Sequence, residues 1–200
     1  MKEHNEDIFY LTDEQPEPVS GALLVAKPTV DDDCFGRSVI LLIDHDKEGT
    51  MGLILNRPTT LMLNDAITLD RVLDDVRLYL GGPVNDNVMF YIHTLGSEIV
   101  PGSVEVLPGL YFAGDFEALK LYIECGGDVK GKVKFFAGYS GWVPGQLDDE
   151  IARYDWAVLD ASDVNRFVDD ASNDLWQWAV EQLGKRYRLW NNWPIDPNVN

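Results

Sequence analysis

The chain has 200 residues, of which 34 are acidic and 16 basic, so its formal net charge is −18 at pH 7. Hydrophobic residues make up 46% and charged residues 25%, which is typical of a globular domain. This length buries enough surface to fold without disulfides or a structural metal. The charge argues against direct binding to DNA or to an anionic membrane, because both are bound through clustered Lys and Arg.

The cysteines and the N-terminus predict a cytoplasmic protein. Cys34 and Cys125 lie far apart and form no Cys-x-x-Cys spacing, so we expect reduced thiols. The N-terminus has no apolar signal core, and the longest aliphatic run, residues 39–43, is far shorter than the ~20 residues that span a bilayer. We expect an acidic, loosely ordered segment over residues 1–19 and a single domain over residues 20–200.

Strands dominate the first half of the chain. Three runs are almost continuously apolar, which is typical of strands covered on both faces. These runs span residues 22–26, 38–44 and 51–56. Further strands are predicted at residues 78–81, 88–93, 103–107, 110–113 and 132–138.

Helices are fewer and lie mainly towards the C-terminus. Asp115 can cap a helix that Gly126 ends, and a shorter helix begins near Gln146. A third helix runs from Asn173 to Gly184, with apolar residues at helical spacing. Strands first, helices last and single helices between strands predict an α+β fold.

Two loops resemble ligand-binding motifs without completing them. Residues 44–49 match the start of a calcium loop, but Leu55 stands where a bidentate Glu is required, so we expect a hairpin turn. Residues 126–133 match Gly-x-x-x-x-Gly-Lys, but Val133 replaces the Ser or Thr that holds Mg²⁺. The helix also precedes this loop, whereas a phosphate loop opens a helix.

Residues 138–142 resemble a nucleophile elbow around Ser140, with Trp142 in place of the last glycine. A serine nucleophile needs a base. No histidine follows His93, so the Ser…Asp…His order is impossible, although His45 or His93 could still approach in space. The alternative interpretation is a tight strand-to-helix connection that serves folding or recognition.

The remaining ionisable residues predict structural roles. Lys130, Lys132 and Lys134 alternate along one predicted strand and are expected to form a solvated face. His93 is expected to be packed or hydrogen-bonded, and Cys34 is a poor nucleophile because carboxylates precede it. Neither histidines nor cysteines have metal-ligand spacing, so we expect no metal site and no cofactor.

Several segments together resemble the AlgH/YqgE-like family of small bacterial proteins. The resemblance covers about residues 20–185, and the segments that carry it are residues 21–28, 35–45, 52–58, 81–84 and 138–147, followed by Glu150 and Trp156. It implies an α+β fold in which a bifurcated β-sheet curls into a pseudo-barrel with flanking helices. The family name comes from a proposed role in the regulation of alginate synthesis, and the resemblance implies no catalytic residues.

We expect a non-catalytic binding or regulatory module with an unidentified protein or small-molecule partner. The candidate binding surface comprises Asn56, Arg57, Pro58, Gly81, Gly82, Pro83, Tyr139, Ser140, Trp142 and Gln146. The alternative is a hydrolase that uses the loop at residues 138–146, with Ser140 or the acidic cluster at residues 148–150 as the reactive group.

Overall fold

The computed structural model describes residues 15–30, 32–73, 75–160, 163–169 and 174–193. Ten strands and six short α-helices occur within these ranges. The strands are β1 (Leu23–Ala26), β2 (Val39–Asp46), β3 (Gly49–Ile54), β4 (Pro58–Met62), β5 (Arg77–Leu80), β6 (Val84–His93), β7 (Val104–Leu107), β8 (Leu110–Phe112), β9 (Val133–Trp142) and β10 (Trp156–Leu159). The helices are α1 (Leu63–Ala66), α2 (Phe116–Glu124), α3 (Gln146–Ala152), α4 (Val164–Val168), α5 (Leu175–Gln182) and α6 (Arg188–Asn191), with a 3₁₀ turn at Lys185–Tyr187.

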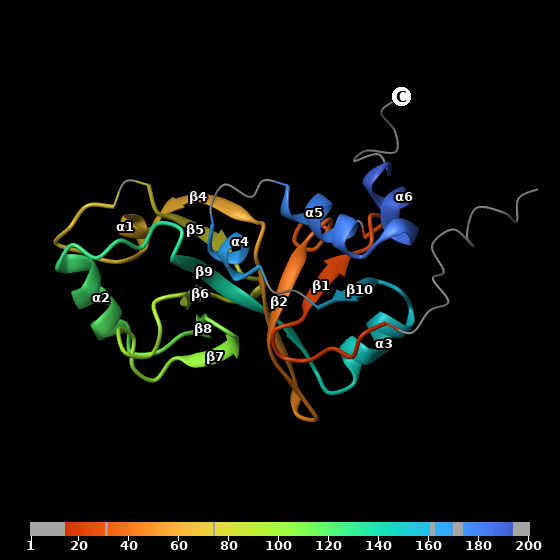
Figure 1. The fold of residues 1–200 in the computed structure, drawn as a ribbon, viewed down its shortest axis with the longest axis horizontal. Helices are drawn as coiled ribbons and strands as arrows, with labels where there is room; N and C mark the ends of the chain where they lie inside the picture. The colour runs from red at the N-terminus through yellow and green to blue at the C-terminus, as the bar shows by residue number, and fades with distance from the viewer. Residues whose placement is uncertain (1–14, 31, 74, 161–162, 170–173, 194–200) are drawn as a thin grey trace, which may run out of the picture.

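The sheet divides at β9, which runs through the middle of the molecule (Figure 1). The first half of β9 pairs in parallel with β5, placing Phe135 opposite Leu78. Its second half pairs antiparallel with β3, placing Ser140 opposite Gly52. Strand β6 pairs with the other edge of β9. The predicted α+β single-domain class is confirmed, and the divided sheet is not closed into a barrel.

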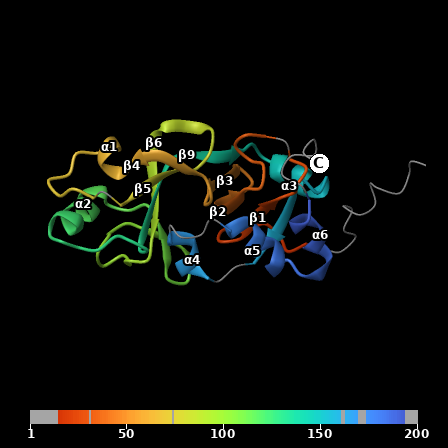
Figure 2. The same ribbon diagram turned by 90° about the horizontal axis from the view of Figure 1, so that it is seen from above.

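Strands β1 and β2 are covered on both faces, as their continuous apolar runs predict. Leu23 and Val25 belong to a core cluster that includes residues of α4 and α5. Leu24 and Ala26 belong to a separate cluster on the opposite face, which includes Leu147 of α3. Figure 2 shows α5 and α3 on opposite sides of these strands. A third cluster joins α2 to β5, β6 and β9.

Several predicted elements are confirmed. The side chain of Asp115 accepts hydrogen bonds from the Glu117 and Ala118 N–H groups and so caps α2. Helix α3 begins at Gln146 as expected. Helix α5 contains the predicted apolar face, but Asn173 lies outside the described residues, as do residues 1–14 of the predicted N-terminal segment. None of the helices in the described ranges has the length and hydropathy needed to cross a bilayer.

Two predictions are wrong in detail. Strand β9 continues to Trp142, so residues 138–142 are strand and only residues 143–145 form the connection to α3. Lys134 does not lie on a solvated face, because it is only 1% exposed. Its Nζ donates to the Asp169 carbonyl at 3.2 Å and lies 4.0 Å from the ring centroid of Tyr79. These contacts offset the cost of burying the ammonium group.

Candidate functional site

The candidate site begins where the chain after β5 crosses β9 so closely that the two backbones are in contact. The Gly81 N–H donates to the Ala137 carbonyl at 2.9 Å. A Cβ at Gly81 would lie 2.2 Å from the Gly138 oxygen, and a Cβ at Gly82 would lie 2.3 Å from the Ser140 nitrogen. Gly138 itself has φ +68°, a conformation that glycine adopts without strain. Glycine is therefore required on both sides of the crossing.

Ser140 is completely buried at this crossing. Its hydroxyl donates to the Gly81 carbonyl at 3.1 Å and so ties β9 to the segment that follows β5. His45 Nδ1 lies 2.6 Å from Thr50 Oγ1, and His93 Nε2 lies 3.1 Å from the Ala113 oxygen. Neither histidine is positioned as a base for Ser140.

Asn56 and Arg57 hold the neighbouring loop in place. The Asn56 side chain accepts from the Val39 N–H and donates to the Arg37 carbonyl, both at 2.9 Å. The Arg57 guanidinium donates to the carbonyl groups of Cys34 and Gly36. Both residues therefore fix the conformation of the chain at residues 34–37.

Two tryptophans, one in the strand before α3 and one in the strand after it, donate to the same carboxylate oxygen. The indole N–H groups of Trp142 and Trp156 each donate to Glu150 Oε2 at 2.8 Å. The other oxygen of Glu150 accepts from the Gln146 side chain at 2.9 Å, one helical turn earlier. Gln146 also accepts from the Val143 N–H, which closes the connection between β9 and α3. This network holds Glu150 in one orientation.

These segments wall a cavity of about 370 Å³, which we name the tryptophan cleft. It is lined by Val30, Asp32, Phe35, Pro83, Gly141, Trp142, Gln146, Glu150, Asp155 and Trp156. Its volume lies within the range of small-molecule sites.

The cleft contains only part of the predicted surface. Pro83, Trp142 and Gln146 line it directly, whereas Arg57 contributes by holding the loop that carries Phe35. Gly81 and Gly82 form the backbone crossing beside it, and Asn56 acts through the same loop.

Pro58 and Tyr139 do not line the cleft. Pro58 pairs with Tyr79 at the start of β4. Tyr139 packs edge to face on Phe90, with ring centroids 5.6 Å apart.

Sequence reasoning did not assign five lining residues to the binding surface: Val30, Asp32, Phe35, Asp155 and Trp156. It named Glu150 only within the acidic cluster of the hydrolase alternative. The spacing of Gln146 and Glu150, four residues apart on a helix, was the one local signal that could have pointed to the network.

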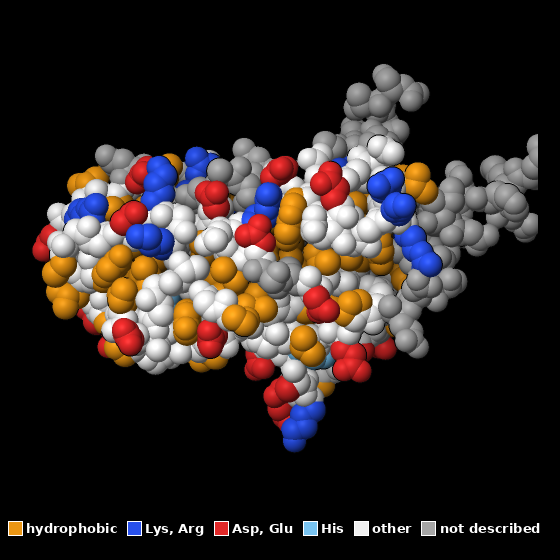
Figure 3. All heavy atoms as spheres, in the orientation of Figure 1, with side chains coloured by type: hydrophobic (Ala, Val, Ile, Leu, Met, Phe, Trp, Pro, Cys, Tyr) orange, Lys and Arg blue, Asp and Glu red, His pale blue; other side chains and the backbone are white. Residues whose placement is uncertain are grey.

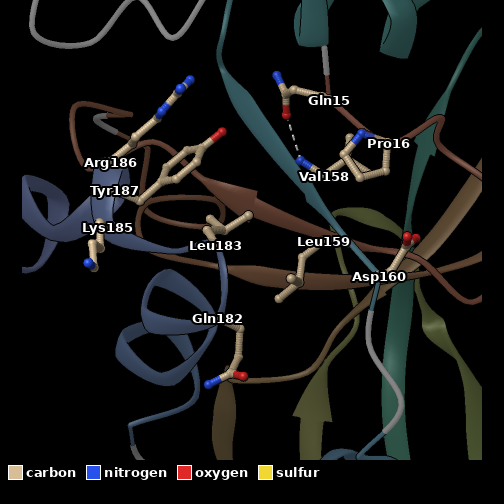
Figure 4. A pocket seen from close by; sticks show the side chains of 10 residues that line it. All are labelled: Gln15, Pro16, Val158, Leu159, Asp160, Gln182, Leu183, Lys185, Arg186 and Tyr187. Carbon is tan, nitrogen blue, oxygen red and sulfur yellow. Dashed lines mark hydrogen bonds between the residues drawn. The ribbon is translucent and has the colours of Figure 1, made fainter. Parts of the chain in front are cut away.

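Two other cavities are present, and the first shares Gly141 and Trp142 with the tryptophan cleft. One, of about 480 Å³, is next to the β2–β3 hairpin and includes Tyr139 and Thr50. The other, of about 540 Å³, lies between β10 and the turn after α5 (Figure 4). There the Gln15 side chain accepts from the Val158 N–H at 2.8 Å and donates to the Trp156 carbonyl at 3.4 Å. Gln15 thereby occupies hydrogen-bonding groups on the outer edge of β10.

The surroundings of Cys34, in the loop that carries Phe35, make it a poor nucleophile. Burial, with a smaller contribution from Asp32, raises the pKa of the Cys34 thiol, which disfavours the reactive thiolate. Burial lowers the pKa of the buried His93. Across the described ranges, no three His, Cys, Asp or Glu side chains are grouped so that they could hold a metal ion.

Fold and site together define a small α+β protein whose divided sheet carries an aromatic-walled cleft. Comparison with known proteins identifies the family to which this protein belongs. A family model described as AlgH-like (DUF179) matches residues 23–188, so the chain belongs to the AlgH-like family. This result confirms the family resemblance seen in the sequence.

Relatives match over almost the whole chain. A UPF0301 protein from Parabacteroides distasonis is 43% identical, covering 97% of this chain and 98% of the relative. A second from Bacteroides fragilis is 40% identical, covering 98% of each. The crystal structure of a Corynebacterium diphtheriae protein superposes with a TM-score of 0.73 at 26% identity, covering 89% of this chain and 94% of that one. The solution structure of the AlgH protein from Pseudomonas aeruginosa gives 0.67 at 26% identity, covering 92% and 98%.

Proposed function

We propose that the protein is a non-catalytic binding module that recognises its ligand in the tryptophan cleft. The observation that carries this proposal is the convergence of three distant segments on one cavity: the loop held by Arg57, Pro83 after β5, and the β9–α3 connection. The glycine crossing and the Glu150 network fix the walls before any ligand arrives. Such preorganisation reduces the entropic cost of binding.

The position of Ser140 supports binding over catalysis. A nucleophilic hydroxyl must reach its substrate and pass its proton to a base. Ser140 is fully buried, and its hydroxyl donates to a backbone carbonyl instead. We therefore assign it a structural role in the crossing behind the cleft.

Crystals soaked with a mixed library of small amines, carboxylic acids and neutral aromatic fragments test this proposal. We expect fragments to occupy the tryptophan cleft, in contact with Trp156 or Glu150, which line the cleft and neither of the two other cavities. Fragments bound only in the two other cavities, with the cleft empty throughout, would contradict the proposal.

A hydrolase is the second candidate, and one observation favours a different hydroxyl for it. Thr50 Oγ1 lies 2.6 Å from His45 Nδ1, and His45 Nε2 lies 4.0 Å from Asp148 Oδ1. A hydroxyl, an imidazole and a carboxylate placed near one another are the groups from which a hydrolytic triad is built. An esterase and amidase screen separates the candidates: turnover that survives Ser140→Ala but is lost in Thr50→Val and His45→Gln would establish the hydrolase.

We propose that any regulatory role is exerted through ligand or protein contacts in the cytoplasm, not through direct DNA binding. The net charge of −18 supports this assignment. On the face shown in Figure 3, Lys and Arg side chains occur in small separate groups with Asp and Glu between them. A DNA-binding surface instead gathers basic residues along one face.

A further inference from the structure

The chemical class of the ligand follows from the charges that line the tryptophan cleft, and this inference rests on the binding function proposed above. Three carboxylates line the cleft, those of Asp32, Glu150 and Asp155. Its described lining contains no lysine, arginine or histidine. The guanidinium groups of Arg57 and Arg153 lie outside the lining, and Arg153 Nε is 3.2 Å from Asp155 Oδ2.

Among the described residues, no positive group compensates the negative charge of Glu150. It accepts three hydrogen bonds, from Trp142, Trp156 and Gln146, and all three donors are neutral. Within the described ranges, no basic side chain forms an ion pair with it. The carboxylate is half-buried, where a charge interacts more strongly with a neighbouring charge than it does in water. The neutral donors orient Glu150 and leave its charge available to a ligand.

Three aromatic rings, with Val30 and Pro83, form the apolar part of the wall. Phe35 and Trp156 meet edge to face with centroids 5.9 Å apart, and Trp156 and Trp142 do so at 6.2 Å. Elsewhere in the chain, aromatic rings already carry a cation: Arg37 lies 4.7 Å from the Trp176 ring centroid, and Arg166 lies 5.0 Å from that of Trp178. Among the described residues, no Lys or Arg has such a contact with the three rings of the cleft.

We propose that the tryptophan cleft binds a small alkylammonium ion. The carboxylate of Glu150 faces the positive charge, and the walls formed by Phe35, Trp142 and Trp156 contact the alkyl groups. Carboxylates combined with aromatic rings are the surroundings that favour such cations. The strongly negative charge of the whole chain also raises the local concentration of cations.

Three ligands of nearly equal shape test the assignment: choline, its neutral isostere 3,3-dimethylbutan-1-ol, and the anion 3,3-dimethylbutanoate. Binding is followed by the indole N–H signals of Trp142 and Trp156 in ¹⁵N-labelled full-length protein, assigned with Trp→Phe variants. We expect choline to shift both signals and to bind on the order of tenfold more tightly than the neutral isostere. The anion should shift neither signal.

Variants locate the effect in the cleft. Glu150→Gln should weaken choline binding by about tenfold and leave binding of the neutral isostere unchanged. Glu150→Gln also disturbs the hydrogen bonds of the two indoles. The double variant Asp32→Asn/Asp155→Asn, called the aspartate pair, therefore provides a second test that leaves those hydrogen bonds intact. The matched control is Asp46→Asn. Like Asp32, Asp46 accepts a backbone N–H in a turn, but it lies outside the cleft.

The outcomes separate this inference from the proposed function. If the neutral or anionic isostere shifts the two indole signals as strongly as choline, the cleft is still a binding site and the cation assignment is overturned. If choline binding is unchanged in Glu150→Gln and in the aspartate pair, the assignment is also overturned. If no ligand shifts either indole, the cation assignment fails, and fragment occupancy in the soaked crystals decides separately whether the cleft binds anything.

Discussion

Trp142 and Trp156 meet edge to face, with ring centroids 6.2 Å apart and ring planes at 84°. One lies at the end of β9 and the other begins β10, and α3 occupies the chain between them. Their shared acceptor, Glu150, lies on that helix. The pair therefore joins two strands and a helix and at the same time forms a wall of the tryptophan cleft.

Trp142 should act first as a core residue, because it is only 7% exposed and packs in the cluster beneath α3. We expect Trp142→Ala to lower the free energy of unfolding by about 3–5 kcal/mol. Trp142→Phe keeps a ring and loses the hydrogen bond to Glu150, so it should cost about 2 kcal/mol. Urea unfolding measures both. If the free energy of unfolding of Trp142→Ala equals that of the wild type, the ring does not contribute to the core.

The glycine crossing can be tested with two glycines of almost equal φ. Gly138 has φ +68° and Gly131 has φ +65°. A Cβ at Gly138 would lie 2.5 Å from the Gly82 oxygen, whereas a Cβ at Gly131 would meet nothing within 4 Å. Gly131→Ala should cost only the conformational strain of about 1–2 kcal/mol. Gly138→Ala should cost at least about 2 kcal/mol more, because backbone must move. Equal losses in denaturant unfolding would mean that the close approach is unimportant.

His93 should make stability depend on pH. Burial lowers its pKa below the ordinary value of 6.5, so the folded state holds the ring neutral. As pH falls through 6.5, the unfolded chain takes up a proton that the folded chain does not, and the free energy of unfolding decreases until the folded pKa is reached. The difference in stability between wild type and His93→Gln should therefore shrink between pH 7 and pH 5. Unfolding curves of both proteins across this range measure the difference, and a constant difference would contradict the account.

The protein should not bind duplex DNA. Its net charge of −18 repels phosphate, and counterion release cannot compensate without clustered basic residues. Titration of labelled duplex at about 50 mM salt favours binding and is therefore the most permissive condition. Sub-micromolar, salt-sensitive binding there would favour direct regulation of transcription instead.

The sequence predicted the elements whose signals are local. Apolar runs located β1 and β2, and the side chain of Asp115 located the start of α2. Strand β10 was missed because its pairing with β1 joins segments more than a hundred residues apart. The length of β9 was also missed, because Gly138 and Gly141 indicate a turn. In the structure they lie inside a strand, and Gly138 admits the backbone of Gly82.

The candidate site was predicted only in part, because it too depends on contacts between segments that are far apart in the chain. Its glycines and Trp142 stand together in recognisable segments, but Phe35 reaches the cleft through the contacts of Arg57 with the chain at residues 34–36. Burial of Ser140 depends on Gly81, 59 residues earlier in the chain. Neither relationship has a local pattern in the sequence.

The most direct test of the account is a calorimetric titration of choline into three proteins under one condition: wild type, Ser140→Ala, and the pair Asp32→Asn with Asp155→Asn. The account predicts equal dissociation constants for wild type and Ser140→Ala, because Ser140 lies behind the cleft and only ties β9 to Gly81. It predicts weaker binding in the aspartate pair, because these substitutions remove two of the three carboxylates that line the cleft. Weakened binding in Ser140→Ala, with binding to the aspartate pair unchanged, would contradict the claim that the tryptophan cleft is the binding site.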